Sequence, residues 1–173
     1  SVSALAGSLS ASLLLMTINL SYNEKMDEYG VNISKIKYNL LSLVDKDSEA
    51  FDKVMTAFTL PKKNDSDKKN RNEAIQNAYK NAVVTPMLIL EQTSKILIAI
   101  KKIYKLINQN CLSDLGVSVE LASSSIKGAV MNIRINLSEI EDKIYVEETN
   151  KKVDSILSNV NSLLSYLNKN III

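Results

Sequence analysis

The residue of this sequence with the clearest potential for chemistry is Asp47. Residues 33–58 carry large apolar side chains at alternating spacings of three and four, which is typical of one buried face of an α-helix. Asp47 is the one member of this series that is not apolar. The other members are Ile33, Ile36, Leu40, Val44, Phe51, Val54 and Phe58. A carboxylate at a core position is costly to bury without a partner, and it can give or take a proton.

Two structural explanations of Asp47 stay open on spacing alone. In the stretch V-D-K-D-S-E-A-F, Asp47 could cap a new helix after a break, with Glu49 in the first turn. It could equally form a buried ion pair. Asp45, Glu49 and Asp52 lie off the apolar face, so we interpret them as solvated charges.

A second candidate site is a polar line on a helix predicted from Leu115 to Leu137. Ser125, Asn132 and Asn136 share one helix face with Ala129. Asn side chains both donate and accept hydrogen bonds, which suits a heterocycle with mixed edges. A helix–helix seam with buried Asn side chains explains the line equally well.

Lys62 and Lys63 follow Pro61 at a predicted helix end, where they could bind an anionic ligand tail, although loop lysines are more often simply solvated. Cys111 has no base near it in sequence, and we interpret it as structural.

The composition excludes several classes of protein. The sequence has no His, which excludes Ser-His-Asp and Cys-His catalysis and removes the commonest zinc ligand. A net charge of +2, with acids mixed among the basic residues, argues against a nucleic-acid-binding protein. One cysteine allows no internal disulfide and favours a reducing compartment, so we expect a cytoplasmic protein.

These residues must be held by long helices, because the 173 residues include only 4 Gly and 2 Pro. We predict a single all-α domain over 1–173, a bundle of about six helices without strands. Breaks are expected at 21–30, with Asn23 and Gly30, at 61–70, and at 108–114, where Ser113 or Asp114 would be an N-cap. A short helix over 71–84 would precede another that begins at Pro86.

Two predicted helices are unusually apolar. Residues 1–20 carry no charge, but their several hydroxyl and amide side chains favour a buried helix over a signal peptide or membrane span. Its small-residue face would let another helix approach closely; this face contains Ala4, Gly7, Ser8 and Ala11. Residues 87–107 are apolar nearly all round, which indicates a central helix or a subunit interface.

Several blocks together resemble the formiminotransferase-cyclodeaminase C-terminal family, in the order in which the family has them. The blocks are SVSALAGSL at 1–9, LVDKDSEAFDKVMTAFTLPK at 43–62, TP at 85–86, LSDLGV at 112–117 and NIRINL at 132–137. Members normally carry a Pro-Gly-Gly-Gly run before the first block, which begins here at Ser1. Glu24 stands where the family usually has a basic residue.

The resemblance implies an all-α homodimer that acts on a reduced folate, with no cofactor besides this tetrahydrofolate substrate and no metal. It implies formimidoyltetrahydrofolate cyclodeaminase or methenyltetrahydrofolate cyclohydrolase activity, with Asp47 as the catalytic carboxylate. The substrate-binding residues that follow from the matching blocks are Ser1, Lys62, Ser113, Asp114, Asn132 and Asn136. The alternative is a non-catalytic helical module for dimerisation or protein interaction, which would leave Asp47 unexplained.

Overall fold

The computed structural model describes residues 1–21 and 23–171, and this part of the chain contains five α-helices and no strand. The helices are α1 (Val2–Asn19), α2 (Asp27–Phe58), α3 (Asp65–Ile103), α4 (Leu112–Leu137) and α5 (Lys143–Asn170). The all-α prediction is confirmed. The single domain predicted over 1–173 stays a prediction, and its residues 22 and 172–173 lie outside the described part.

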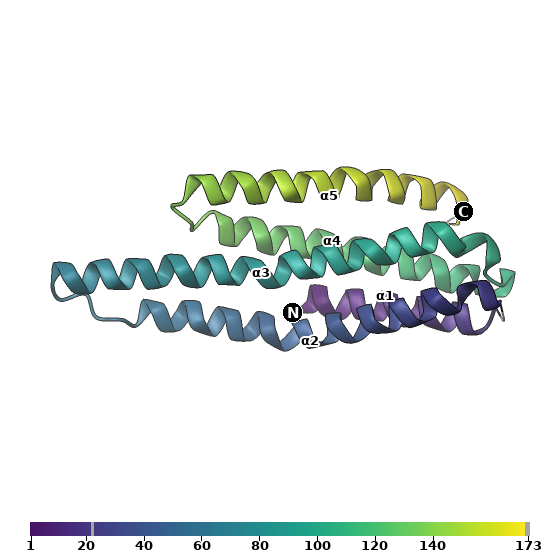
Figure 1. The fold of residues 1–173 in the computed structure, drawn as a ribbon, viewed down its shortest axis with the longest axis horizontal. Helices are drawn as coiled ribbons and strands as arrows, with labels where there is room; N and C mark the ends of the chain where they lie inside the picture. The colour runs from purple at the N-terminus through teal and green to yellow at the C-terminus, as the bar shows by residue number, and fades with distance from the viewer. Residues whose placement is uncertain (22, 172–173) are drawn as a thin grey trace.

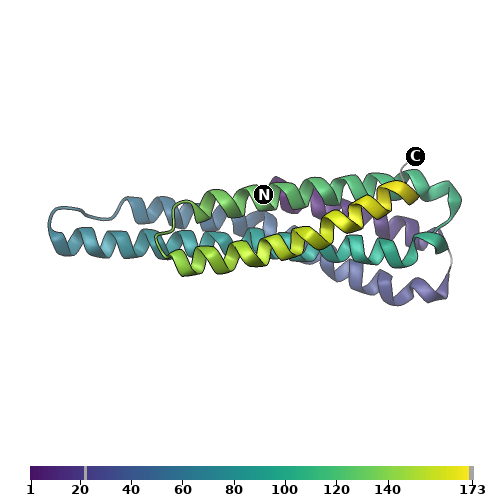
Figure 2. The ribbon, with the colours of Figure 1, turned by 90° about the horizontal axis from the view of Figure 1, so that it is seen from above.

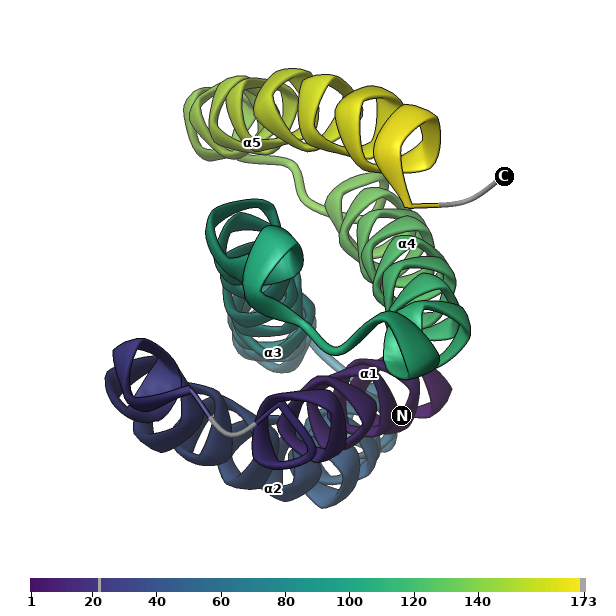
Figure 3. The same ribbon diagram turned by 90° about the vertical axis from the view of Figure 1, so that its right-hand side faces the viewer.

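The helices form an elongated bundle in three layers. Seen along the long axis, α1 and α2 form one layer, α3 and α4 the next, and α5 the outermost (Figure 3). Figure 2 shows α5 lying obliquely over the other helices, and it contacts α3 and α4. At one end the hairpin of α2 and α3 projects beyond the N-terminus of α1 (Figure 1). The bundle therefore has fewer helices at that end.

The prediction of about six helices is wrong because no break occurs at Pro86. The segments predicted as 71–84 and 86–107 are two parts of α3, which continues through this proline. Pro86 is buried against the core, and the packing of α3 on α2 and α4 outweighs the local preference for a break. The loop expected at 61–70 is also shorter, since Asn64 caps α3 by accepting a hydrogen bond from the Asp67 amide at 2.8 Å.

Two other predicted boundaries change. Gly30 lies inside α2 rather than in a break, while Asn23 caps a short 3₁₀ turn, Glu24–Met26. Ser113 and Asp114 lie in the first turn of α4, which begins at Leu112, so neither is its N-cap. The carboxylate of Asp114 is still well placed there, because the N-terminal end of a helix favours negative charge. Cys111, just before α4, is buried as a free thiol.

Helix α1 packs through its small residues, as its small-residue face predicted. Gly7 lies so close to α2, α3 and α4 that an added Cβ would be 2.8 Å from the Thr93 hydroxyl oxygen. Along the contact with α4, the hydroxyls of Ser10 and Ser118 each donate to the other residue's carbonyl oxygen at 2.8 Å. Ser125 donates to the Ser3 carbonyl at 2.7 Å. These bonds satisfy the polar groups of a seam that large side chains would hold apart.

One stripe of large apolar side chains on α1 faces away from the bundle, although residues 1–20 were expected to form a buried helix; Leu14 and Ile18, outside this stripe, are in the core. The exposed ones are Val2, Leu5, Leu9, Met16 and Leu20. By length and composition alone, α1 and the Asp65–Leu106 segment could each cross a membrane. The core position of α3 accounts for its apolar character, whereas packing within one chain leaves the leucine stripe of α1 uncovered.

Candidate active site

A pocket of about 420 Å³ lies between α2, α3 and the C-terminal end of α4. Twelve residues line the pocket: six from α2, two from α3 and four from the end of α4 and the turn after it. They are Asp47, Ala50, Phe51, Val54, Met55, Phe58, Tyr79, Ala82, Asn132, Ile135, Asn136 and Glu139. The volume is in the usual range for small-molecule sites. The pocket lies at the end of the bundle where α2 and α3 extend past α1.

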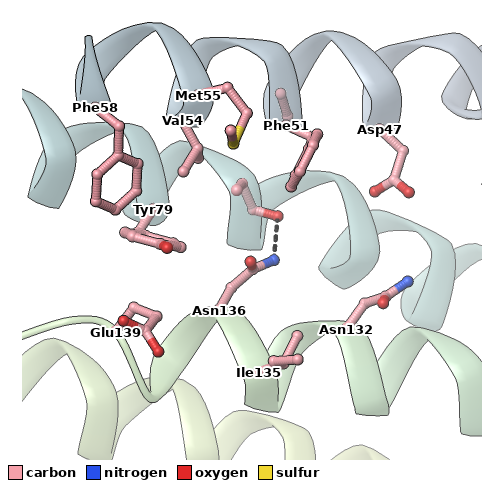
Figure 4. Close-up of a pocket in the computed structure, with 12 residues that line it drawn as sticks. Asp47, Phe51, Val54, Met55, Phe58, Tyr79, Asn132, Ile135, Asn136 and Glu139 are labelled. Carbon is pink, nitrogen blue, oxygen red and sulfur yellow. Dashed lines mark hydrogen bonds between the residues drawn. The ribbon is translucent and has the colours of Figure 1, made fainter.

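Asp47 points its carboxylate toward this pocket from the middle of α2, opposite Asn132 (Figure 4). Helix α2 runs without interruption from Asp27 to Phe58, so Asp47 does not cap a new helix. Among the described residues, no salt bridge or hydrogen bond to its side chain is found at normal distances. Asp47 is only half-buried, so a ligand in the pocket can reach its carboxylate.

The residues of the predicted polar line on α4 have two different roles, one for each of the two explanations considered above. Ser125 belongs to a helix seam, since it is buried and bonds to α1 and to Thr93. Asn132 and Asn136, two and three turns further along, line the pocket together with Asp47. The structure therefore brings together the three residues that the periodicity and the polar line singled out. Asn136 also donates from Nδ2 to the Ala82 carbonyl at 3.1 Å.

Two polar groups of the pocket were not predicted, Tyr79 and Glu139. Burial raises the pKa of the Tyr79 hydroxyl, and the negative charge of Glu139 raises this pKa further. The hydroxyl therefore stays protonated at neutral pH and can donate a hydrogen bond. Glu139 continues the spacing of Asn132 and Asn136 by one more turn, so extending the polar line would have found it. Tyr79 had no such signal, because the sequence predicted only a short helix over 71–84 and no polar line along it.

The rest of the pocket wall is apolar, and part of it is exposed to solvent. Phe51 and Ile135, from α2 and α4, are 62% and 66% exposed, which is unusual for side chains of this size. At the Phe58 end, the Phe58 ring packs edge-on against Tyr79 and under the Arg71 guanidinium, 5.4 Å from the ring centre. Arg71 also donates to the Phe58 carbonyl. Flat rings and an open face suit a planar, partly apolar ligand.

Two of the predicted substrate-binding residues lie near the pocket but do not line it. Ser1 is beside its Asp47 end, since its amino group donates at 2.8 Å to the carbonyl of Val44, about one turn before Asp47. Lys62 is exposed in the connection between α2 and α3, beyond the Phe58 end. Their places at opposite ends fit a ligand longer than the pocket.

The prediction that Ser113 and Asp114 share a pocket with Asn132 is wrong within one chain. All three residues are on α4, and Ser113 is roughly 28 Å from Asn132 along the axis, from the usual rise per residue. Ser113 borders a different groove, formed with Leu112, Gly116, Val117, Glu120, Leu121, Ser124 and Ile171. A continuous helix keeps its two ends apart, and the sequence blocks alone did not reveal this separation.

Known proteins resemble this chain over most of its length. The family model described as formiminotransferase-cyclodeaminase matches residues 1–155. Formimidoyltransferase-cyclodeaminase of Rattus norvegicus is 29% identical over 165 residues, which cover 91% of this chain and 30% of that protein. Methenyltetrahydrofolate cyclohydrolase of Methylorubrum extorquens is 28% identical over 168 residues, which cover 92% of this chain and 81% of that protein. The chain thus spans less than a third of the rat relative.

The fold is also that of a solved structure. The crystal structure of formiminotetrahydrofolate cyclodeaminase from Thermotoga maritima superposes with a TM-score of 0.87 at 21% sequence identity, covering 98% of this chain and 85% of that one. The match over residues 1–155 includes every wall of the pocket around Asp47. The chain therefore belongs to the formiminotransferase-cyclodeaminase family.

Proposed function

We propose that this chain is a folate-dependent one-carbon enzyme, which either cyclises 5-formimidoyltetrahydrofolate or hydrolyses 5,10-methenyltetrahydrofolate. The observation that carries the proposal is the Asp47 carboxylate, unpaired among the described residues, which faces Asn132 across a pocket lined by aromatic rings. Both substrates carry positive charge on their one-carbon unit. The charged side chains of the pocket wall are the two carboxylates of Asp47 and Glu139, which favour such a cation.

In the cyclodeaminase reaction, nitrogen 10 of the folate attacks the formimidoyl carbon held on nitrogen 5. The new carbon–nitrogen bond closes the ring, the bond to the terminal nitrogen breaks, and ammonia leaves. Asp47 would take the proton of nitrogen 10 and give a proton to the departing nitrogen, so that one carboxylate serves both steps. The reaction involves no oxidation or reduction, and the methenyl product keeps the positive charge of the protonated formimidoyl group.

In the cyclohydrolase reaction, water adds to the methenyl carbon and the bond from that carbon to nitrogen 5 then breaks. The product is 10-formyltetrahydrofolate, and one proton is released. Asp47 would orient the water, accept its proton and stabilise the cation in the ground and transition states. A single carboxylate beside the one-carbon unit is thus sufficient for either reaction.

The ligand would lie along the pocket, with Asn132 and Asn136 bound to the polar edges of the pterin. The glutamate tail would leave past Phe58 toward the connection that carries Lys62, where Arg71 adds a second cation. Ser1 would border the Asp47 end. Ser113 and Asp114 could contribute only from a second chain, because they lie at the far end of α4.

Assaying both substrates side by side tests this function. We expect the absorbance of the methenyl group to fall when 5,10-methenyltetrahydrofolate is hydrolysed, or to rise when 5-formimidoyltetrahydrofolate is cyclised. If the protein changes neither substrate and binds no reduced folate saturably, the enzyme assignment is wrong and a helical interaction module becomes the better description.

We also propose that the chain forms a homodimer through the exposed stripe of α1. Helix α1 has no charged residue, and its leucines leave an uncovered apolar strip about 27 Å long. Two copies packed antiparallel would cover each other's strip without burying a charge, since the same face is self-complementary. Exposed apolar side chains of the adjoining α2, namely Val31, Tyr38 and Leu41, would extend the contact.

Replacing both Leu5 and Leu9 by Glu is expected to make the protein monomeric. In a symmetric dimer each leucine is buried in both chains, so each substitution counts twice, and the dissociation constant should rise about 100-fold or more. Sedimentation equilibrium of the wild type should give twice the chain mass, and the variant should give the chain mass. Ile144→Glu is the control, because Ile144 is equally apolar and 73% exposed but lies on α5. A monomeric wild type, or one that binds lipid vesicles through α1, contradicts the proposal.

We keep the cytoplasm as the proposed location, on the ground of the single reduced cysteine, Cys111.

A further inference from the structure

One helical hydrogen bond is missing in the middle of α3, next to the pocket. Pro86 has no N–H group, so it cannot donate to the carbonyl of Ala82, four residues earlier. Both residues are buried. A buried carbonyl without a donor destabilises a protein, and native structures nearly always supply a partner for it.

The partner comes from another helix. The side-chain amide of Asn136 on α4 donates from Nδ2 to the Ala82 carbonyl at 3.1 Å (Figure 4). This bond connects residues 54 positions apart in the sequence, and it fills the place of the missing helical hydrogen bond. The continuity of α3 through Pro86 and the position of Asn136 are therefore linked.

The bond also fixes which way the Asn136 amide faces. A carbonyl oxygen only accepts, so the NH₂ group must be the part turned toward Ala82. The amide oxygen is then on the other side, and Figure 4 shows it directed toward the Tyr79 side of the pocket. No hydrogen bond of the described residues involves this oxygen, so it is left to a ligand.

We propose that Pro86 is a positioning residue: by freeing the Ala82 carbonyl, it holds the Asn136 amide with its oxygen toward the pocket, and the site therefore selects a ligand edge with an N–H donor. A reduced pterin has such donors at its pyrimidine ring. Among residues 1–21 and 23–171, no hydrogen bond holds the Asn132 side-chain amide in this way, so it can turn either way. The identity of the ligand in this inference rests on the proposed function, whereas the locked amide does not.

A double-mutant cycle with 5-formyltetrahydrofolate as the probe tests the inference. This stable reduced folate carries its one-carbon unit on nitrogen 5, and its binding can be measured by calorimetry. Asn136→Ala should weaken binding about tenfold, as expected for one lost hydrogen bond. Pro86→Ala gives α3 its own N–H donor, which competes with the Asn136 amide for the Ala82 carbonyl and loosens its hold on that amide, so the substitution should weaken binding about fivefold. In the Asn136→Ala background, Pro86→Ala should have no further effect.

The thermal midpoint separates this role from a merely structural one. Pro86→Ala should melt at a temperature no lower than that of the wild type, because alanine restores a helical hydrogen bond. Its ligand affinity should nevertheless fall, and a merely structural role of Pro86 does not predict this combination. Val84→Ala, on the exposed side of the same turn, is the matched control and should bind as the wild type does. Pro86→Ala with wild-type affinity, or with the same weakening in both backgrounds, overturns the inference.

Nuclear magnetic resonance of the wild type keeps the inference testable if Pro86→Ala does not fold. The side-chain amide protons of Asn136 should exchange with solvent at least about tenfold more slowly than those of the exposed Asn81 on α3. Equal exchange rates would overturn the locked amide. If the wild type shows the slow amide but binds no reduced folate, the proposed function fails while the amide geometry stands.

Discussion

Asp47→Asn is expected to lower kcat/KM for the active folate substrate about 1,000-fold, within the usual range for loss of a general acid or base. Asn has the same shape as Asp but cannot accept or return a proton at neutral pH. The substitution removes no hydrogen bond or ion pair of the described residues, so the chain should still fold. Initial rates with both folate substrates, together with the thermal midpoint, check this result.

The stability of the same variant provides a second, independent readout. A half-buried carboxylate without a protein partner costs free energy, and an amide in its place costs less. Asp47→Asn should therefore melt at or slightly above the temperature of the wild type. Asp45→Asn, on the exposed side of α2, is the control and should keep both rate and stability. An Asp47→Asn protein with near-normal turnover would show that another group transfers the proton, and a strongly destabilised one would show a structural role.

Gly7→Ala is expected to destabilise the fold by about 1–3 kcal/mol, although alanine is the better helix former. The added Cβ would be 2.8 Å from the Thr93 hydroxyl oxygen, 2.9 Å from that of Ser125 and 3.1 Å from a methyl carbon of Leu40. The two hydroxyls are hydrogen-bonded to each other at 3.1 Å and are buried, so neither can move away freely. Urea unfolding of the two proteins measures the difference.

Gly30→Ala is the matched control, and its effect should have the opposite sign. Gly30 is also inside a helix, but an added Cβ would meet one atom of Ile18 at 3.7 Å, an ordinary contact. The gain in helix propensity should then dominate and stabilise the protein by about 0.5–1 kcal/mol. Equal effects of the two substitutions would mean that α1 is not packed as closely against α3 and α4 as described.

The helical fold could be predicted from the sequence because its signals are local. Apolar spacings of three and four depend only on the geometry of a single helix, and they isolated Asp47 before any packing was known. The polar line on α4 identified Asn132 and Asn136 by the same argument. The break at Pro86 was predicted wrongly because its remedy, the Asn136 amide, comes from another helix.

Two features of the site depend on which helices are neighbours. Tyr79 and Glu139 join the pocket only because α3 and the end of α4 meet beside α2. Ser113 and Asp114 do not line the pocket because α4 is one continuous helix of 26 residues that keeps its two ends apart, which matching sequence blocks do not reveal. Leu5 and Leu9 of α1 lie on a regular apolar face that stays exposed, whereas the small residues of the opposite face pack inside together with Leu14 and Ile18.

The sequence by itself thus determined the all-α class and the carboxylate at position 47, which depend on residue spacings within single helices. It also determined the family, which depends on short blocks of residues in a fixed order along the chain. Only the tertiary structure decided which polar groups surround that carboxylate, which face of α1 stays outside, and that α3 continues through Pro86. These outcomes depend on contacts between residues tens of positions apart, where close packing and hydrogen-bond satisfaction outweigh local propensity.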